Sequence, residues 1–375
     1  REYVAGLMME EAGLSVWIDP AANLIGRRPG LQDLPALVIG SHLDTVPGGG
    51  RFDGIVGVLA GLEIARLLHE KDCFLRHPLE VIVFSAEEPS PFGISTVGSR
   101  AMVGSLAREQ LSLLSDHDGR TLGEAIAFLG GSPEVIHLAK RSRNDMTAAF
   151  ELHVEQGSVL ENSGCSIGIV TGIVGIHRGS IHVFGRGDHA GTISMADRRD
   201  ALVAASEGVV ALDRICREMD GVVGTIGTLE LVPNASNVIP TEVRLGLDLR
   251  SLNPERSSKA LERFGQELKA IASTRDVCID FAPYLSSSAV NFDQALVDCL
   301  QTVCRYLDIA SCQMSSGAGH DMSHISEVVP TGMMFLPSWQ GRSHCAEEWT
   351  SFEDIYRGVK TLGTAIVELD KDMDT

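Results

Sequence analysis

Imidazole and carboxylate side chains follow four short apolar runs of this sequence. These side chains are His42, the adjacent pair Glu87 and Glu88, His153 and His344. Histidine nitrogen and carboxylate oxygen are ligands that zinc and manganese bind in proteins. If the four runs are neighbouring strands, the side chains meet beyond the carboxyl ends of those strands, where open α/β sheets bind ligands. The spacing therefore predicts a metal-dependent site.

Asp53 is a further candidate ligand, because it stands just before a helical pattern and within reach of the same sheet edge. A single carboxylate can bridge two metal ions about 3.5–4 Å apart. Adjacent residues of an extended segment point in opposite directions, so one glutamate of the pair at 87 and 88 can bind metal while the other faces the reacting water. Asp44 can turn back and hold the His42 ring as a hydrogen-bond partner. Taken singly, Asp53 fits a turn, the two glutamates fit a solvated pair, and each histidine fits a residue satisfied within the core or at the surface. Taken together, these residues favour a metal centre.

The runs that position these side chains have the lengths of buried strands. They cover residues 37–40, 79–84, 148–152 and 331–336. Residues 53–70 carry apolar side chains at helical spacing, and residues 293–307 and 351–369 are further predicted helices. This alternation of strands and helices predicts a sheet covered by helices on both faces.

The middle of the chain has a different pattern. Its predicted elements are strands at 178–185, 224–232, 242–249 and 277–281, and helices at 197–219 and 254–273. The order β-α-β-β-α-β predicts a ferredoxin-like unit. We therefore expect an α/β fold in which one mixed-sheet domain, residues 1–176 and 286–375, is interrupted by an inserted ferredoxin-like domain at residues 177–285.

Composition narrows the function classes. The chain has 375 residues with 31 Lys and Arg against 50 Asp and Glu, a net charge of −19. This balance argues against a nucleic-acid partner or an anionic membrane surface, because phosphates demand a basic face. No uncharged apolar run reaches roughly 18 residues, so we expect no transmembrane helix. The eight scattered cysteines form no C-x-x-C pair and suggest reduced thiols in a cytoplasmic protein. Arg1 to Val4 are neither a signal peptide nor a natural start, so we expect the sequence to begin within a longer chain.

Five segments together resemble the M20 metallopeptidase superfamily. They are S-H-L-D-T-V-P at 41–47, R-F-D-G at 51–54, E-E at 87–88, E-L-H-V-E-Q-G at 151–157 and G-R-S-H at 341–344. The chain more closely resembles the amidase/carbamoylase branch, which holds N-carbamoyl-L-amino-acid hydrolases, allantoate amidohydrolases and ureidoglycolate amidohydrolases. The H-x-E-Q-G segment is specific to that branch, since the peptidases usually place a carboxylate at the position of His153. The resemblance covers nearly the whole chain.

The resemblance implies two divalent metal ions per subunit, zinc or manganese, with nickel or cobalt also compatible. The implied ligands are His42 and His153 for one ion, Glu88 and His344 for the other, and Asp53 between them. Glu87 would act as general base on the water that bridges the metals and would later protonate the leaving nitrogen.

Further matches imply a substrate site and a homodimer. His189, in G-D-H-A-G, would enter the partner subunit's site and steady the oxyanion, so the inserted domain would serve as a dimerisation and lid domain. Asn237 would bind substrate, and Arg250 would grip a substrate carboxylate. Gln156 would bind the ureido group and Gly317 would offer backbone to the ligand. A surface salt bridge for Arg250, a helix start for Gln156 and a plain turn for Gly317 are the alternatives.

The resemblance leaves the substrate open. Ile176 stands where allantoate enzymes usually have a glutamine, whereas the E-E-P segment at 87–89 is familiar from ureidoglycolate enzymes. We expect a cytoplasmic binuclear hydrolase of N-carbamoyl-L-amino acids, with allantoate or ureidoglycolate as the alternative small ureido substrate carrying a carboxylate. A dipeptidase or aminoacylase is disfavoured by His153. A binding protein without catalysis is disfavoured because all candidate ligands and the base are present.

Overall fold

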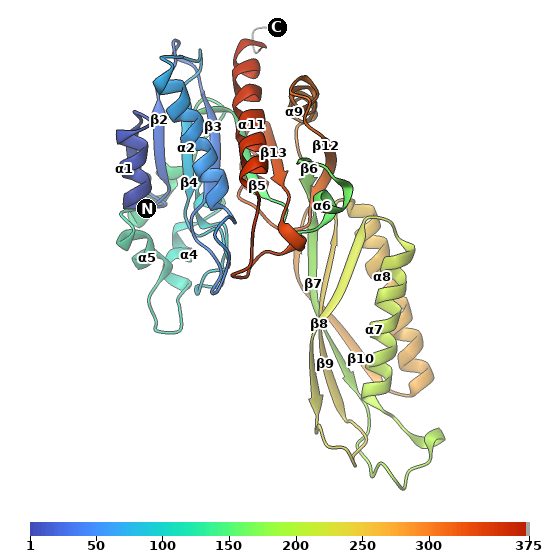
Figure 1. Cartoon of the computed structure of the whole chain (residues 1–375). Helices are drawn as coiled ribbons and strands as arrows, with labels where there is room; N and C mark the ends of the chain where they lie inside the picture. The colour runs from blue at the N-terminus through green and yellow to red at the C-terminus, as the bar shows by residue number, and fades with distance from the viewer. Residues whose placement is uncertain (373–375) are drawn as a thin grey trace. The chain divides into compact units, whose positions relative to one another are not determined.

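The four apolar runs that precede the candidate ligands are neighbouring strands of one sheet in the computed structural model, which describes residues 1–372 (Figure 1). The strands are β3 (Ala36–His42), β4 (Leu79–Phe84), β5 (Met146–Val154) and β13 (Thr331–Leu336). β3 pairs in parallel with both β4 and β5, and β13 pairs in parallel with β5. Their carboxyl ends therefore lie at the same edge of the sheet, as the sequence predicts.

The outer strands make this sheet mixed. The full order is β1-β2-β4-β3-β5-β13-β6-β11, and β12 also pairs with β6. The outer strands are β1 (Ser15–Ile18), β2 (Leu24–Arg28), β6 (Ile167–Ile173), β11 (Val290–Asn291) and β12 (Ser311–Ser316). β2 runs antiparallel to β4, and β6 runs antiparallel to β13. The predicted mixed-sheet α/β fold is thus confirmed.

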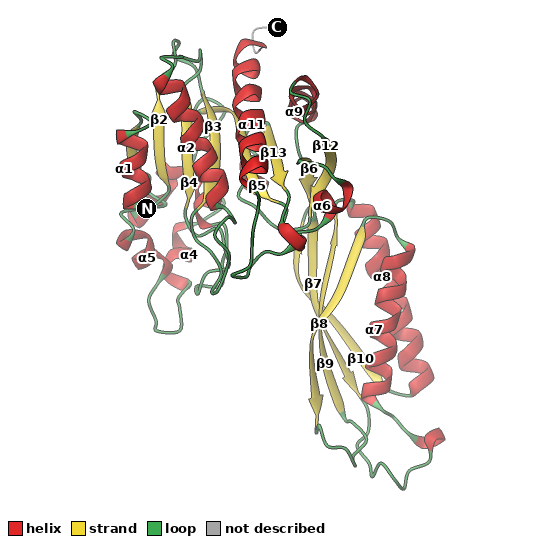
Figure 2. Ribbon diagram, viewed as in Figure 1, coloured by secondary structure: helices red, strands yellow, loops and turns green. Residues whose placement is uncertain are grey.

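Helices cover this sheet, as the burial of its central strands requires. Every residue of β3, β4 and β13 is buried, so both faces of the sheet must be covered. The helices and 3₁₀ segments are α1 (Glu2–Glu10), α2 (Ile55–Glu70), α3 (Val97–Val103), α4 (Arg108–Leu113), α5 (Leu122–Phe128), η1 (Pro133–Ala139), α6 (Val159–Ser163), α9 (Gln294–Tyr306), α10 (Met322–Ile325), η3 (Trp339–Gly341) and α11 (Phe352–Asp372). Figure 2 shows α2 and α11 lying along the sheet. Among the described residues, no helix is both long and apolar enough to span a membrane.

The chain divides into two compact units. One holds Arg1–Thr171 and the chain from Phe292 onward, and the other holds Gly172–Asn291. The second unit contains β7 (Gly175–Phe184), η2 (Met195–Asp197), α7 (Ala201–Glu218), β8 (Val222–Val232), β9 (Glu242–Ser251), α8 (Pro254–Arg275) and β10 (Cys278–Ser287). Its antiparallel sheet has the order β10-β7-β9-β8, and the element order is β-α-β-β-α-β.

Local signals explain the two long helices of this unit. The Asp200 carboxylate accepts hydrogen bonds from the first turn of α7, and the Asn253 side chain caps α8 in the same way. Phe264 and Leu268 of α8 pack with Leu212 of α7 in a buried core over the sheet. The strands continue beyond the predicted limits of the inserted domain, because β7 begins at Gly175 and β10 ends at Ser287. The residues that lie beyond the predicted limits are Gly175 and Ile176 in β7 and Ser286 and Ser287 in β10, and none of them marks a boundary in the sequence.

Candidate metal centre and active site

The carboxylate of Asp53 lies between imidazole rings. His153 Nε2 is 3.1 Å and His42 Nε2 is 3.6 Å from Asp53 Oδ1. The Nδ1 atom of His153 lies 2.9 Å from the carbonyl of Val154, and that of His42 lies 2.9 Å from the carbonyl of Asp44. A ring whose Nδ1–H donates to a carbonyl keeps its Nε2 lone pair for a metal. Both rings therefore present Nε2 toward Asp53.

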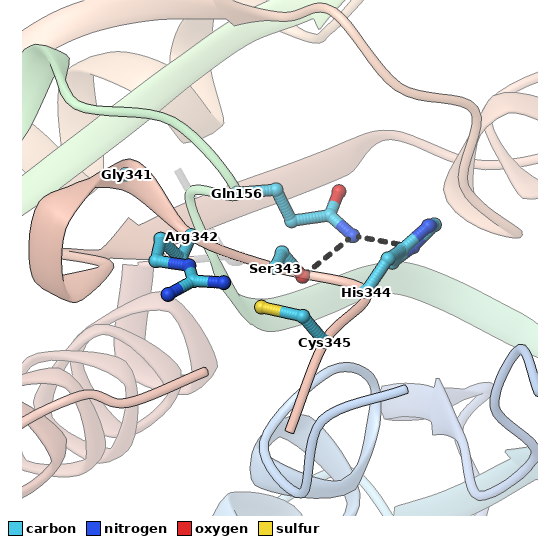
Figure 3. Close-up of a pocket in the computed structure, with 6 residues that line it drawn as sticks. All are labelled: Gln156, Gly341, Arg342, Ser343, His344 and Cys345. Atoms are coloured by element: carbon cyan, nitrogen blue, oxygen red, sulfur yellow. Dashed lines mark hydrogen bonds between the residues drawn. The ribbon is translucent and has the colours of Figure 1, made fainter. Parts of the chain in front are cut away.

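The other oxygen of Asp53 faces a second pair of groups. His344 Nε2 lies 3.0 Å from Asp53 Oδ2 and 3.5 Å from Glu88 Oε1. The Gln156 amide donates a hydrogen bond of 2.8 Å to the same Asp53 oxygen. Figure 3 shows this amide directed at Ser343 and His344, within a pocket of about 410 Å³ that Arg342 and Cys345 also line. His344 is about half exposed, at 47%, so this side of the site opens to solvent.

The electrostatics of the site fit bound cations. Burial opposes the charged form of His153, yet its contacts with Asp53 and Glu151 raise the pKa of His153 to about 9. Burial alone would raise the pKa of Asp53, but the neighbouring imidazoles hold it below its usual range. Buried Glu88 Oε1 has no hydrogen-bond partner among the described residues. Lone pairs and negative charge thus converge where a proton or a metal ion must compensate them.

Two overlapping ligand groups share Asp53. One consists of His42, Asp53 and His153, and the other of Asp53, Glu88 and His344. Within each group the ligand atoms lie within 4.8 Å of one another. The structure therefore brings together all five residues that the sequence analysis assigned as ligands, and their donor set suits zinc or manganese.

Asp44 acts differently from the sequence expectation. Its backbone carbonyl, rather than its carboxylate, accepts the hydrogen bond from His42. The carboxylate lies 3.8 Å from His42 Nδ1 and instead accepts hydrogen bonds from the backbone N–H groups of Glu87, at 3.3 Å, and Glu88, at 2.9 Å. Two N–H donors on an adjacent loop satisfy the carboxylate better than one ring nitrogen. Asp44 therefore positions the segment that carries Glu87 and Glu88.

Glu87 lies beside the same cluster. Its Oε2 is 3.8 Å from His42 Nε2, and the residue is 8% exposed. Burial, and then the carboxylates of Asp321, Glu151 and Glu88, raise the pKa of Glu87 well above its usual range. A carboxyl group with a raised pKa can both accept and return a proton near neutral pH.

The sequence analysis missed several buried polar residues beneath the site. Glu151 accepts a hydrogen bond of 2.7 Å from Ser41, and burial raises the pKa of Glu151 to about 7. The His320 ring packs edge-on against the His153 ring at 4.7 Å between centroids. Glu348, 2% exposed, accepts a hydrogen bond of 3.1 Å from the backbone N–H of Asp53. Glu151 lies two residues before His153, and Glu348 follows His344 by four residues. Their closeness in sequence to the ligand motifs was the one feature from which these two residues could have been predicted.

The predicted substrate residues lie in both units. Gly317 is exposed in the loop after β12, and a Cβ there would meet open space. In the second unit, His189 forms an isolated β-bridge with Val238, the residue after Asn237. The two predicted substrate residues His189 and Asn237 therefore lie close together. Arg250 donates to both carboxylate oxygens of Asp248, at 2.7 and 3.1 Å, so a substrate carboxylate would share or displace that partner.

Comparison with known proteins gives the family. Residues 38–368 match the model of peptidase family M20/M25/M40. An N-carbamoyl-L-amino-acid amidohydrolase of Paenarthrobacter aurescens is 40% identical over 97% of this chain and 89% of its own length. A ureidoglycolate hydrolase of Oryza sativa subsp. japonica is 36% identical over 98% of this chain and 78% of its own length.

A solved structure agrees with these relatives. The amidase of the hydantoinase/carbamoylase family from Burkholderia multivorans superimposes with a TM-score of 0.91 at 33% identity, covering 98% of this chain and 89% of that one. The likeness therefore extends across both units and includes every segment that carries a candidate ligand. The chain belongs to peptidase family M20/M25/M40, in its amidase/carbamoylase branch, and is a hydrolase of linear amide C–N bonds.

Proposed function

We propose that this enzyme hydrolyses the ureido C–N bond of N-carbamoyl-L-amino acids with two divalent metal ions per subunit. One observation carries the proposal: the two oxygens of Asp53 face different ligand groups, with His42 and His153 on one side and His344 and Glu88 on the other. A carboxylate shared in this way suits two ions. The name of the 40% identical relative from Paenarthrobacter aurescens supports the substrate class.

The protein residues divide the work around the bound ions. Divalent ions held there act as Lewis acids that polarise a carbonyl oxygen and make a water molecule more acidic. Glu87 takes a proton from the attacking water and delivers it to the leaving nitrogen. Breaking the C–N bond of R–NH–CO–NH₂ with one water gives the amino acid and carbamic acid, which decomposes to ammonia and carbon dioxide. The raised pKa of Glu87 suits this return of the proton.

Residues outside the ligand set orient the substrate in this proposal. Gln156, whose amide lies between Asp53 and His344, binds the ureido group, and Gly317 offers its backbone. Arg250 and Asn237 hold the carboxylate end of the substrate. The enzyme works as a homodimer in which the partner's His189 steadies the oxyanion.

An assay of ammonia release tests the proposal. Purified enzyme is incubated with manganese and N-carbamoyl-L-methionine, N-carbamoyl-L-leucine, allantoate or ureidoglycolate in turn. We expect the highest kcat/KM for the carbamoyl amino acids, and loss of all activity after chelation with recovery on adding metal. Allantoate or ureidoglycolate is the second candidate, because Pro89 follows Glu88 and the rice relative is named a ureidoglycolate hydrolase. Absence of ammonia from all four compounds would reject the proposed activity.

A further inference from the structure

The carboxylate of Glu348 connects two loops of the candidate metal centre. Its Oε1 accepts hydrogen bonds from the backbone N–H groups of Phe52, at 2.8 Å, and Asp53, at 3.1 Å. Its Oε2 accepts a hydrogen bond of 2.5 Å from the hydroxyl of Ser343, the residue before His344. Glu348 is only 2% exposed, so water contributes little to these contacts. One buried carboxylate thus binds both the loop of the shared ligand Asp53 and the loop of His344.

The Gly50 backbone and an aromatic pair pack closely around this carboxylate. A Cβ at Gly50 would overlap the Glu348 side chain, so only glycine lets this loop approach so closely. Next to it, the rings of Phe52 and Trp349 meet edge to face at 5.5 Å between centroids. The residues flanking Glu348 and Asp53 therefore pack together as well as hydrogen-bond.

The backbone of His344 needs such support. Its φ of 55° lies in the left-handed region, which a histidine adopts only when its surroundings hold it there. The turn that follows is closed by a hydrogen bond of 3.1 Å from the Glu348 N–H to the Cys345 carbonyl. Glu348 therefore restrains the strained residue from both sides, through this turn and through Ser343.

We propose that Glu348 is a positioning residue, which holds Asp53 and His344 at the separation that two bound metal ions require. This inference rests on the proposed binuclear function. A carboxylate suits the role because it accepts from all three donors at once, whereas an amide presents only one acceptor oxygen. Hydrogen-bond partners that orient metal ligands typically contribute 10- to 100-fold to metal affinity.

Metal titration of three variants tests the inference. Glu348→Gln replaces the acceptor that faces Ser343 by a donor. Ser343→Ala removes the hydroxyl from that contact, together with the 3.5 Å contact from the Gln156 amide. Glu347→Gln is the matched control on an exposed neighbour paired with Arg342. Metal-free protein is titrated with Mn²⁺ and Zn²⁺ by calorimetry, and bound metal is counted by elemental analysis. We expect Glu348→Gln and Ser343→Ala to weaken the ion bound by His344 by about 10- to 100-fold, because both disturb the contact with the His344 loop, and Glu347→Gln to weaken neither ion.

The melting temperature of the metal-free protein separates positioning from general stability. We expect it to change little in Glu348→Gln, whereas a purely structural role would lower it and leave metal affinity unchanged. Unchanged affinity for both ions in Glu348→Gln would overturn the inference. If that variant does not fold, wild-type affinity in Ser343→Ala overturns it instead. Unmodified enzyme that binds two ions but hydrolyses no ureido substrate would refute the proposed function and leave the positioning role intact.

Discussion

Ile176 and Arg250 are directly opposite each other in the antiparallel pair of β7 and β9. Side chains at opposite positions project from the same face of a sheet, with Cβ atoms about 4.5–5.5 Å apart. An apolar side chain therefore stands beside the guanidinium that we propose to bind the substrate carboxylate. The Ile176 side chain has no hydrogen-bonding group. A polar part of the substrate that extends from the carboxylate toward Ile176 would therefore find no partner on it.

Substrate choice should therefore depend on Ile176. Allantoate carries a second ureido group, which would be left unpaired beside an apolar residue at a cost of about 1–3 kcal/mol, or roughly 5- to 150-fold. We expect higher kcat/KM for N-carbamoyl-L-leucine or N-carbamoyl-L-methionine than for allantoate, measured in direct competition. Ile176→Gln should shift the ratio toward allantoate, and the matched variant Ile176→Leu should not. A native preference for allantoate or ureidoglycolate would show that Ile176 does not decide specificity.

Glu87 and Asp53 should separate catalysis from metal binding. Glu87→Gln removes the base but none of the proposed ligands, so we expect two metals per subunit and a loss of at least about 10²-fold in turnover. Asp53→Ala removes the carboxylate that both ligand groups share, so we expect metal loss. Elemental analysis together with the turnover number distinguishes the two. Equal metal loss in both variants would contradict the assigned roles.

A mixed dimer tests the proposed role of His189. His189→Ala should bind metal normally and be inactive, because the missing imidazole belongs to the partner's site in the proposal. Subunit exchange with Glu87→Gln would create heterodimers in which one site has both Glu87 and the partner's His189. Random exchange of equal amounts completes about a quarter of all sites, so activity should return toward that fraction. Exchange demonstrated by mass spectrometry without any recovered activity would exclude a shared site.

His324 should make stability depend on pH. Burial, and then the charge of Arg100, lower the pKa of His324 to about 4, and its Nε2 lies 3.0 Å from the Thr96 hydroxyl. Between about pH 6.5 and 4 the unfolded chain takes up a proton that the folded chain refuses, so the free energy of unfolding falls as pH falls. The loss reaches about 3 kcal/mol at the lower end of this range.

Urea unfolding of metal-free protein at pH 7 and pH 4.5 measures this dependence. His324→Gln keeps an N–H near Thr96 without the titrating ring, so its stability should fall less on acidification. His117→Gln is the control, because the His117 side chain is 84% exposed. An equal pH dependence in unmodified and His324→Gln protein would show that His324 is not its source.

The sequence by itself determined the four central strands of the large sheet and the identity of the ligand candidates. Periodicity found β4 and β13 at their observed bounds, because a fully buried strand is an uninterrupted apolar run between polar turns. β1, β2 and the helices between β4 and β5 escaped prediction because they are short: β1 and β2 have four and five residues, and α3, α4 and α5 have six or seven, which leaves little periodic signal. The donors His42, Glu88, His153 and His344 were identified because each follows a predicted strand, and Asp53 because it stands just before a predicted helix.

Only the tertiary structure decided how those donors are held. The Asp44 carboxylate accepts hydrogen bonds from the Glu87 and Glu88 backbone, while the Asp44 carbonyl holds the His42 ring, since a carboxylate takes whichever donors the folded loops bring to it. The approach of Glu348 to the Asp53 backbone joins residues 295 positions apart, and no local pattern encodes that contact. Propensity and periodicity act over a few residues, whereas the geometry of a site depends on loops that meet only when the whole sheet has formed.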